Sequence, residues 1–244
     1  QRDLEWLGLD WDEEQTPQSQ RTEAYAEAFA RLDTYPCYCS RNELHAASAP
    51  HASDGAVIYA GTCRDLTAAE RAAKTRRPAW RVRVPDEEVS FLDGLQGEVR
   101  ENLARECGDF ILRRSDGVYA YQLAVVVDDA AGGVTEIVRG ADLLRSTPRQ
   151  LWLQEQLGFP HPHYYHVPLL CAPDGRRLSK REHDLDLGAL RQTLTAEQLL
   201  GKLAFLAGLL DRPEAASAAE LTREFDWTHV FAKNIFVNSV FFHR

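Results

Sequence analysis

The sequence HVPLLCAPDGRRLSKR, residues 166–181, decides the fold. Its first half is a short apolar run typical of a buried strand, and Pro173-Asp174-Gly175 supplies a turn after it. A basic segment, residues 177–181, follows directly. A cationic loop just past the end of a buried strand is well placed to contact phosphate oxygens at the crevice of an open α/β sheet. A solvated basic turn is the alternative.

Composition sets the outer limits. The chain of 244 residues, 44% of them hydrophobic, is long enough for one large domain or two modest ones. No apolar run approaches the roughly 20 residues that cross a bilayer, and the start has no signal-peptide layout, so we expect a cytoplasmic protein without a membrane partner. The five cysteines fit metal ligation and reduced thiols better than disulfides. We expect Cys107 and Cys171 to be packing residues.

The net charge of -9 argues against nucleic acid as a partner, because affinity for it comes largely from Lys and Arg. The charges are unevenly distributed, however. Acidic residues cluster in residues 10–14, 86–88 and 128–129. Cationic stretches are supplied by Arg76, Arg77, Arg81, Arg83, Arg113, Arg114, Arg145, Arg149 and residues 176–181. A basic face on an acidic protein is therefore compatible with the sequence.

Two motifs carry a family resemblance. Residues 119–150, YAYQLAVVVDDAAGGVTEIVRGADLLRSTPRQ, and the basic segment RLSKR at 177–181 resemble the core and the KMSKS signature of class I aminoacyl-tRNA synthetases of the glutamyl group. The short chain and the pattern Cys37-x-Cys39 with Tyr59-x-x-x-Cys63 are most similar to the glutamyl-Q tRNA(Asp) synthetase branch, which lacks an anticodon-binding domain. The resemblance covers nearly the whole chain and weakens after about residue 227.

The resemblance implies an α/β fold with four parts. A Rossmann-type class I catalytic domain would contribute residues 1–36 and 109–182, the second stretch ending in the KMSKS-like loop. Residues 37–108 would form an inserted, zinc-bearing α/β subdomain similar to an acceptor-binding domain, and residues 183–244 a small helical region. Such domains begin with a strand and a HIGH-like motif that binds adenosine. Neither precedes Gln1: we expect them upstream in a longer protein, and the alternative is a protein that has lost them.

A structural zinc ion is expected in the insertion. Three thiols are candidate ligands: Cys37, Cys39 and Cys63. Zinc in a closed structural site takes four ligands, and by chemistry alone the fourth is His45 or His51. The resemblance instead selects Tyr59, whose phenolate needs the metal's charge to form. The alternative is a set of thiols without metal.

The resemblance places the amino acid against Tyr121 and Arg139. Glutamate carries two carboxylates, and a guanidinium can pair bidentately with one of them, while a phenol adds one oriented hydrogen bond. The alternatives are a core role for Tyr121 and, for Arg139, an ion pair with Asp128, Asp129 or Asp142.

Local signals predict several elements. N-cap residues predict helix starts at Thr16-Pro17, Thr67, Thr147, Thr195 and Ser217. We expect the first of these helices to end near Tyr35-Pro36 and the third at Gly158. Alternation over residues 80–84 predicts a half-buried strand with Arg81 and Arg83 facing outward. A further strand is expected over residues 134–138, and family likeness makes residues 123–127 helical.

The chemistry implied by the resemblance is ATP-dependent activation of L-glutamate, followed by its transfer to the queuosine base at the wobble position of tRNA(Asp). Lys180 would contact ATP and neutralise growing phosphate charge, assisted by Ser179 and Arg177, and magnesium would accompany ATP. A monomer is expected. Two alternatives remain: an ordinary glutamyl-tRNA synthetase truncated at both ends, and a non-catalytic, zinc-containing RNA-binding paralogue.

Overall fold

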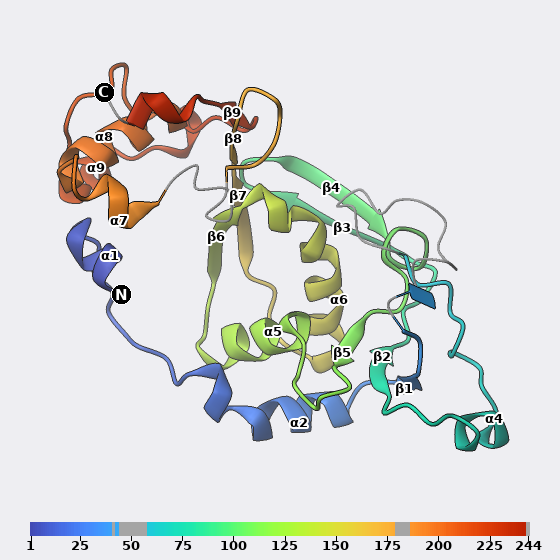
Figure 1. Cartoon of the computed structure of the whole chain (residues 1–244). Coiled ribbons are helices and arrows are strands. Elements are labelled where there is room, and N and C mark those ends of the chain that lie inside the picture. The colour runs from blue at the N-terminus through green and yellow to red at the C-terminus, as the bar shows by residue number, and fades with distance from the viewer. Residues whose placement is uncertain (41, 44–57, 179–185, 243–244) are drawn as a thin grey trace.

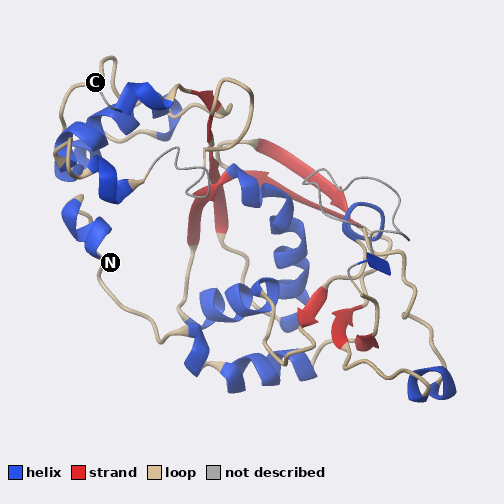
Figure 2. Ribbon diagram, viewed as in Figure 1, coloured by secondary structure: helices blue, strands red, loops and turns tan. Residues whose placement is uncertain are grey.

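The structure is a computed structural model that describes residues 1–40, 42–43, 58–178 and 186–242 (Figure 1). Its centre is a pair of parallel strands, β6 (Glu136–Gly140) and β7 (His163–Val167), with Arg139 opposite His166. Helices α5 (Tyr121–Ala131) and α6 (Thr147–Leu157) contact each other and lie beside these strands (Figure 2). The carboxyl ends of both strands therefore meet at one edge, where α/β folds place their ligands.

An antiparallel region lies next to this layer. Strands β1 (Thr34–Cys37), β2 (Ala79–Val82) and β5 (Ile111–Arg113) form one sheet with β2 in the middle. Strands β3 (Glu88–Asp93) and β4 (Gly97–Asn102) form a hairpin, which a π-helical turn over Leu103–Cys107 follows. The short helix α4 (Ala68–Ala72) projects beyond this region (Figure 1).

The C-terminal region is mainly helical. It contains α7 (Leu187–Leu190), α8 (Ala196–Ala207) and α9 (Ala218–Arg223), together with 3-10 turns over Trp227–His229 and Ser239–Phe242. Its last segment returns to the centre, because β9 (Ile235–Phe236) pairs in parallel with β8 (Leu170–Cys171). The first helix, α1 (Arg2–Trp6), lies against this region through an ion pair of Asp3 with Arg191 at 3.0 Å (Figure 1).

The main core joins the helices to the antiparallel region. Buried residues of α2 (Thr22–Ala30), α5 and α6 pack with Leu103 and Leu112, which are fully buried. Burying a leucine of this kind stabilises the fold by about 1.5–3 kcal/mol. None of the helices in the described ranges combines the length and apolar composition that spanning a lipid bilayer requires.

Several local predictions are confirmed. The capping boxes at Thr67, Thr195 and Ser217 are all formed, and they start α4, α8 and α9. Gly158 ends α6 with a φ of 66°, and residues 173–175 turn the chain with Gly175 at a φ of 89°. These signals work because the capping side chain and the amide that it satisfies lie three residues apart.

Other local predictions are wrong. The helix expected from Thr16-Pro17 begins only at Thr22, after a 3-10 turn over Gln18–Gln20, and it ends at Ala30. Residues Thr34–Cys37 form β1 instead of the end of that helix, because their backbone pairs with β2. The strand expected over residues 134–138 lies two residues later, as β6.

Two side chains also point elsewhere than expected. Arg81 was expected to face outward from β2 but is only 6% exposed. Thr147 was expected to cap α6, but the N-cap is Ser146 and the Thr147 side chain is buried. Both side chains are used in polar contacts described below. The expected domain boundaries stay a prediction.

Candidate functional site

Arg139 lies near the end of β6 and is held by two neutral partners. Its Nε donates a hydrogen bond to Nε2 of His166 at 3.0 Å, and its Nη2 donates to Oγ1 of Thr147 at 2.8 Å. These two acceptors are themselves 3.2 Å apart, so they occupy one side of the planar guanidinium. The guanidinium also lies over the ring of Tyr164, 5.0 Å from its centroid. The opposite edge is formed by Nη1 and the second proton of Nη2, and Nη1 makes no hydrogen bond within the described residues.

A buried carboxylate fixes the orientation of His166. His166 is fully buried, and its Nδ1 lies 2.5 Å from Oδ2 of Asp93, a residue only 2% exposed. Asp93 also accepts the backbone N–H groups of His166, Leu95 and Gln96. Burial lowers the pKa of His166, and the charge of Arg139 lowers it further. The imidazole is therefore neutral, with its proton on Nδ1 and its Nε2 free to accept from Arg139.

The expected ion-pair alternatives for Arg139 are mostly occupied elsewhere. Asp128 pairs with Arg21 at 2.7 Å, and Asp142 pairs with Arg177. Asp129 is different: burial raises its pKa, and the charge of Arg139 opposes that rise. Arg139 is thus oriented by its neutral hydrogen-bond partners while its positive charge stays available at the sheet edge.

Tyr121 opens α5 and is 48% exposed, so it is no core aromatic. Burial raises the pKa of Tyr164. The charge of Arg139 opposes this rise, and Tyr121 adds to it. The Arg139 guanidinium lies over the Tyr164 ring, and Tyr121 begins helix α5, which lies beside the strand of Arg139. The expected roles of Tyr121 and Arg139 in holding the amino acid stay a prediction.

The basic loop begins at the same edge. Arg177 forms an isolated bridge with Cys171, and its Nη1 pairs with Oδ2 of Asp142, which lies in the turn directly after β6. The charge of Asp142 raises the pKa of His166, so Asp142 and the Arg139 cluster share one neighbourhood. Ser179 and Lys180 lie outside the described residues, and their expected positions stay a prediction.

The three expected thiols form a cluster. The Sγ atoms of Cys37, Cys39 and Cys63 all lie within 4.8 Å of one another, with Cys39 and Cys63 3.6 Å apart. The hydroxyl of Tyr59 lies 3.6 Å from Sγ of Cys37 and 4.0 Å from Sγ of Cys39. A tetrahedral zinc site would place its sulfur atoms about 3.8 Å apart and sulfur and oxygen about 3.5 Å apart. The four side chains therefore fit zinc, while His45 and His51 lie outside the described residues.

The surroundings of the cluster favour a thiolate at Cys37 but not at Cys39, whose pKa burial and the charge of Cys37 raise to about 12. The backbone N–H of Tyr38 donates to Sγ of Cys63 at 3.4 Å, and that of Cys63 donates to the Tyr59 oxygen at 2.7 Å. Burial alone would raise the pKa of the Cys37 thiol, but Arg81 and Tyr59 more than offset this and lower it. Burial raises the pKa of Tyr59 far above its ordinary range, so a phenolate would need a metal to form.

Sequence reasoning missed the residues behind Arg139. Asp93 and His166 are 73 residues apart, and Thr147 carried a helix-cap signal that concealed its contact with Arg139. One signal was available: His166 interrupts an apolar strand, and a buried histidine in a strand needs a polar partner.

Comparisons with known proteins agree with this geometry. Residues 1–240 match the family model of the catalytic domain of class I tRNA synthetases (E and Q). The chain belongs to this family of ligases, and the expected α/β class I fold is confirmed.

Curated relatives narrow the family further. A glutamyl-Q tRNA(Asp) synthetase from Symbiobacterium thermophilum is 48% identical over 247 residues, covering 93% of this chain and 76% of the relative. One from Nitratidesulfovibrio vulgaris is 51% identical over 225 residues, covering 85% of this chain and 69% of the relative. The resemblance to this branch is thereby confirmed.

A solved structure shows the same fold. A glutamate tRNA ligase from Elizabethkingia meningosepticum, crystallised in complex with its amino acid, superposes with a TM-score of 0.77 at 23% identity. The match covers 99% of this chain, which spans 57% of that ligase.

Proposed function

We propose that the protein activates L-glutamate with ATP and transfers it to queuosine in tRNA(Asp). The observation that carries this proposal is the fixed guanidinium of Arg139 at the carboxyl end of β6, with one edge held by His166 and Thr147 and the other left for a carboxylate. The names of the relatives in the glutamyl-Q tRNA(Asp) synthetase branch support the choice of acceptor.

Glutamate recognition follows from the charge and shape of Arg139. Its outer edge would accept a carboxylate bidentately, a geometry that favours glutamate over glutamine because an amide offers only one acceptor oxygen. The exposed hydroxyl of Tyr121 would add one oriented hydrogen bond.

In the first step, an oxygen of the glutamate α-carboxylate attacks the α-phosphorus of ATP. A new O–P bond forms, the bond to the β-phosphate breaks, and magnesium pyrophosphate leaves. The nucleophile is already anionic, so the protein supplies position and charge rather than a base. Lys180, with Ser179 and Arg177, would neutralise charge on the phosphates, and Asp142 would hold Arg177 ready at the edge of the crevice.

In the second step, a hydroxyl of the queuosine cyclopentene ring attacks the carbonyl carbon of the mixed anhydride. The acyl C–O bond to phosphate breaks, AMP leaves, and the hydroxyl proton is lost to solvent. One zinc ion on Cys37, Cys39, Tyr59 and Cys63 would be structural, since four protein ligands leave no open coordination position. We propose that the protein works in the cytoplasm as a monomer.

The test is glutamate-dependent ATP–pyrophosphate exchange by the full-length protein without tRNA, followed by transfer of labelled glutamate to tRNA with and without queuosine. We expect exchange without tRNA and labelling only of queuosine-containing tRNA(Asp). Labelling of the 3′ end of tRNA(Glu) would identify an ordinary glutamyl-tRNA synthetase instead. Absence of exchange in every condition would favour a non-catalytic RNA-binding protein.

A further inference from the structure

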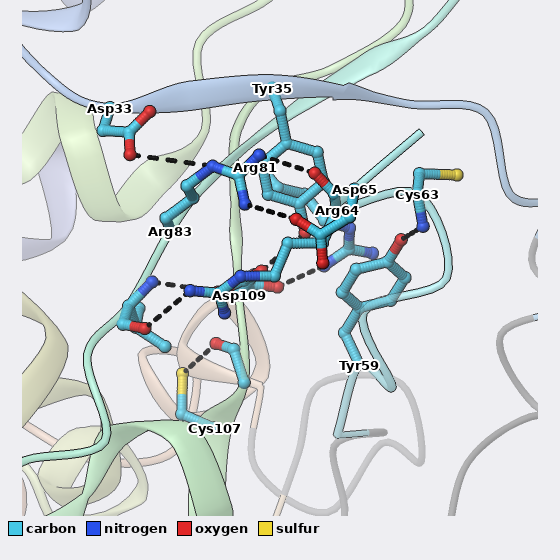
Figure 3. Close-up of polar contacts among 12 residues, drawn as sticks. Asp33, Tyr35, Tyr59, Cys63, Arg64, Asp65, Arg81, Arg83, Cys107 and Asp109 are labelled. Carbon is cyan, nitrogen blue, oxygen red and sulfur yellow. Dashed lines mark hydrogen bonds and ion pairs between the residues drawn. The ribbon is translucent and has the colours of Figure 1, made fainter. Parts of the chain in front are cut away.

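Arg81 occupies the middle of β2, beneath the thiol cluster, and is 6% exposed. The carbon of its guanidinium lies 3.8 Å from the centroid of the Tyr59 ring, close enough for a strong cation–π contact. Its Nη1 donates to the backbone oxygen of Asp109 at 2.6 Å. Figure 3 shows the Tyr59 hydroxyl joined to the nitrogen of Cys63, with Arg81 and Asp109 on the other side of Tyr59 from Cys63.

The charge of Arg81 lacks a carboxylate partner within the described ranges. The carboxylate of Asp109 is used by other groups, since it accepts from the Tyr35 hydroxyl at 2.6 Å, from Nη1 of Arg64 at 2.9 Å and from the backbone of Val84 at 2.9 Å. The buried Nε of Arg81 makes no hydrogen bond to any residue that the structure describes. Because an unpaired buried cation is costly, another negative charge is expected beside it.

A zinc-loaded cluster supplies that charge. Three thiolates and a phenolate around a divalent ion leave a net charge of about -2, and a protonated phenol would still leave about -1. The cluster is itself mostly buried, since Cys37, Tyr59 and Cys63 are each less than 7% exposed. A buried negative cluster and a buried guanidinium without a carboxylate partner among the described residues are complementary, and the Tyr59 ring brings the two into contact.

We propose that Arg81 is the positioning residue of the zinc site, which orients the Tyr59 ring and offsets the negative charge of the loaded cluster. Zinc affinity then depends on a residue outside the ligand set, as outer groups at metal sites commonly tune affinity by about 10- to 100-fold. Because Arg81 lies on β2 and donates to the backbone oxygen of Asp109, the position of its guanidinium depends on the sheet that β1, β2 and β5 form. The inference rests on the proposed zinc site.

The test measures zinc affinity of the full-length protein by competition with a chromophoric chelator. Arg81→Met removes the guanidinium and its charge and keeps an unbranched apolar stem, and we expect an affinity loss of about 10- to 100-fold with one zinc still bound at saturation. Arg83→Met is the matched control, because Arg83 lies over Tyr35 at 4.8 Å instead of over Tyr59. We expect that variant to stay within about twofold of the parent.

Cobalt(II) substitution provides a readout independent of activity. The visible spectrum of the cobalt-loaded protein reports the geometry of its ligands, and we expect it to change in Arg81→Met and to be unchanged in Arg83→Met. If Arg81→Met does not fold, Arg81→Lys serves as the test variant. Lysine keeps the charge but cannot stack a planar group on the Tyr59 ring, so the zinc affinity should fall by about threefold or more.

Three outcomes of these measurements would overturn the inference. A parent protein that binds no zinc would remove the zinc site and the role of Arg81 together. A parent that binds zinc, with Arg81→Met and Arg81→Lys of parental affinity and spectrum, would refute the role of Arg81 alone. Equal losses in Arg81→Met and Arg83→Met would assign the effect to the stability of the sheet.

Discussion

Replacing Arg139 with lysine separates its charge from its planar geometry. Lysine keeps the positive charge but cannot hold His166 and Thr147 on one side while offering two donors on the other. At least one charge-assisted hydrogen bond to the glutamate carboxylate is lost, which is worth about 1.5–3 kcal/mol. The KM for glutamate should therefore rise by about 10- to 150-fold. Leaving the buried acceptors without a donor should also lower the free energy of unfolding by about 1–3 kcal/mol.

The assay is glutamate-dependent ATP–pyrophosphate exchange, with the KM values for glutamate and ATP measured separately. The KM for ATP should change by less than about twofold, because the nucleotide is held by other groups. Arg100→Lys is the control: Arg100 is 58% exposed on the hairpin and pairs with Glu88 and Glu98. An Arg139→Lys variant with a parental KM for glutamate would refute the proposed role of this guanidinium.

Three further predictions concern the basic loop, the thiol cluster and His166. Lys180→Ala should abolish exchange while the zinc content stays at the parental level, as measured by metal analysis; loss of zinc would show that the loop is structural. Cys63→Ser should lower metal stoichiometry and solubility before it affects exchange, and native stoichiometry would contradict its role as a ligand. Because burial lowers the pKa of His166 below its usual 6.5, the imidazole should accept from Arg139 throughout neutral pH. The KM for glutamate should be constant above pH 6.5 and rise as the pH falls through the lowered pKa, where protonation removes the acceptor. Folding stability should fall as the pH drops from 6.5 toward the lowered pKa, because the unfolded chain binds the proton first. A KM that is flat well into the acid range, with the protein folded, would argue against this contact.

Local signals predicted what depends on near neighbours in the chain. The capping boxes at Thr67, Thr195 and Ser217 formed because each needs only a side chain and an amide three residues away. The thiol cluster followed from the family motifs, whereas the placement of Tyr121 and Arg139 around the amino acid stays a prediction. These motifs carry information on tertiary structure that periodicity lacks.

Features that depend on tertiary packing were not predictable in this way. Alternation along β2 placed Arg81 on one face of the strand but could not reveal that the thiol cluster covers that face. The sequence around Thr147 is typical of an N-cap, but in the structure its hydroxyl accepts a hydrogen bond from Arg139 instead. Asp93 meets His166 across 73 residues, a separation for which a single sequence gives no signal.

The most direct measurement is a crystal structure of the full-length protein with a non-hydrolysable glutamyl-adenylate analogue. Both terminal nitrogens of Arg139 should lie within hydrogen-bonding distance of one glutamate carboxylate, with Lys180 reaching the phosphate group of the same ligand from across the crevice. A ligand bound away from Arg139, or a Lys180 side chain on an unrelated surface, would contradict the account.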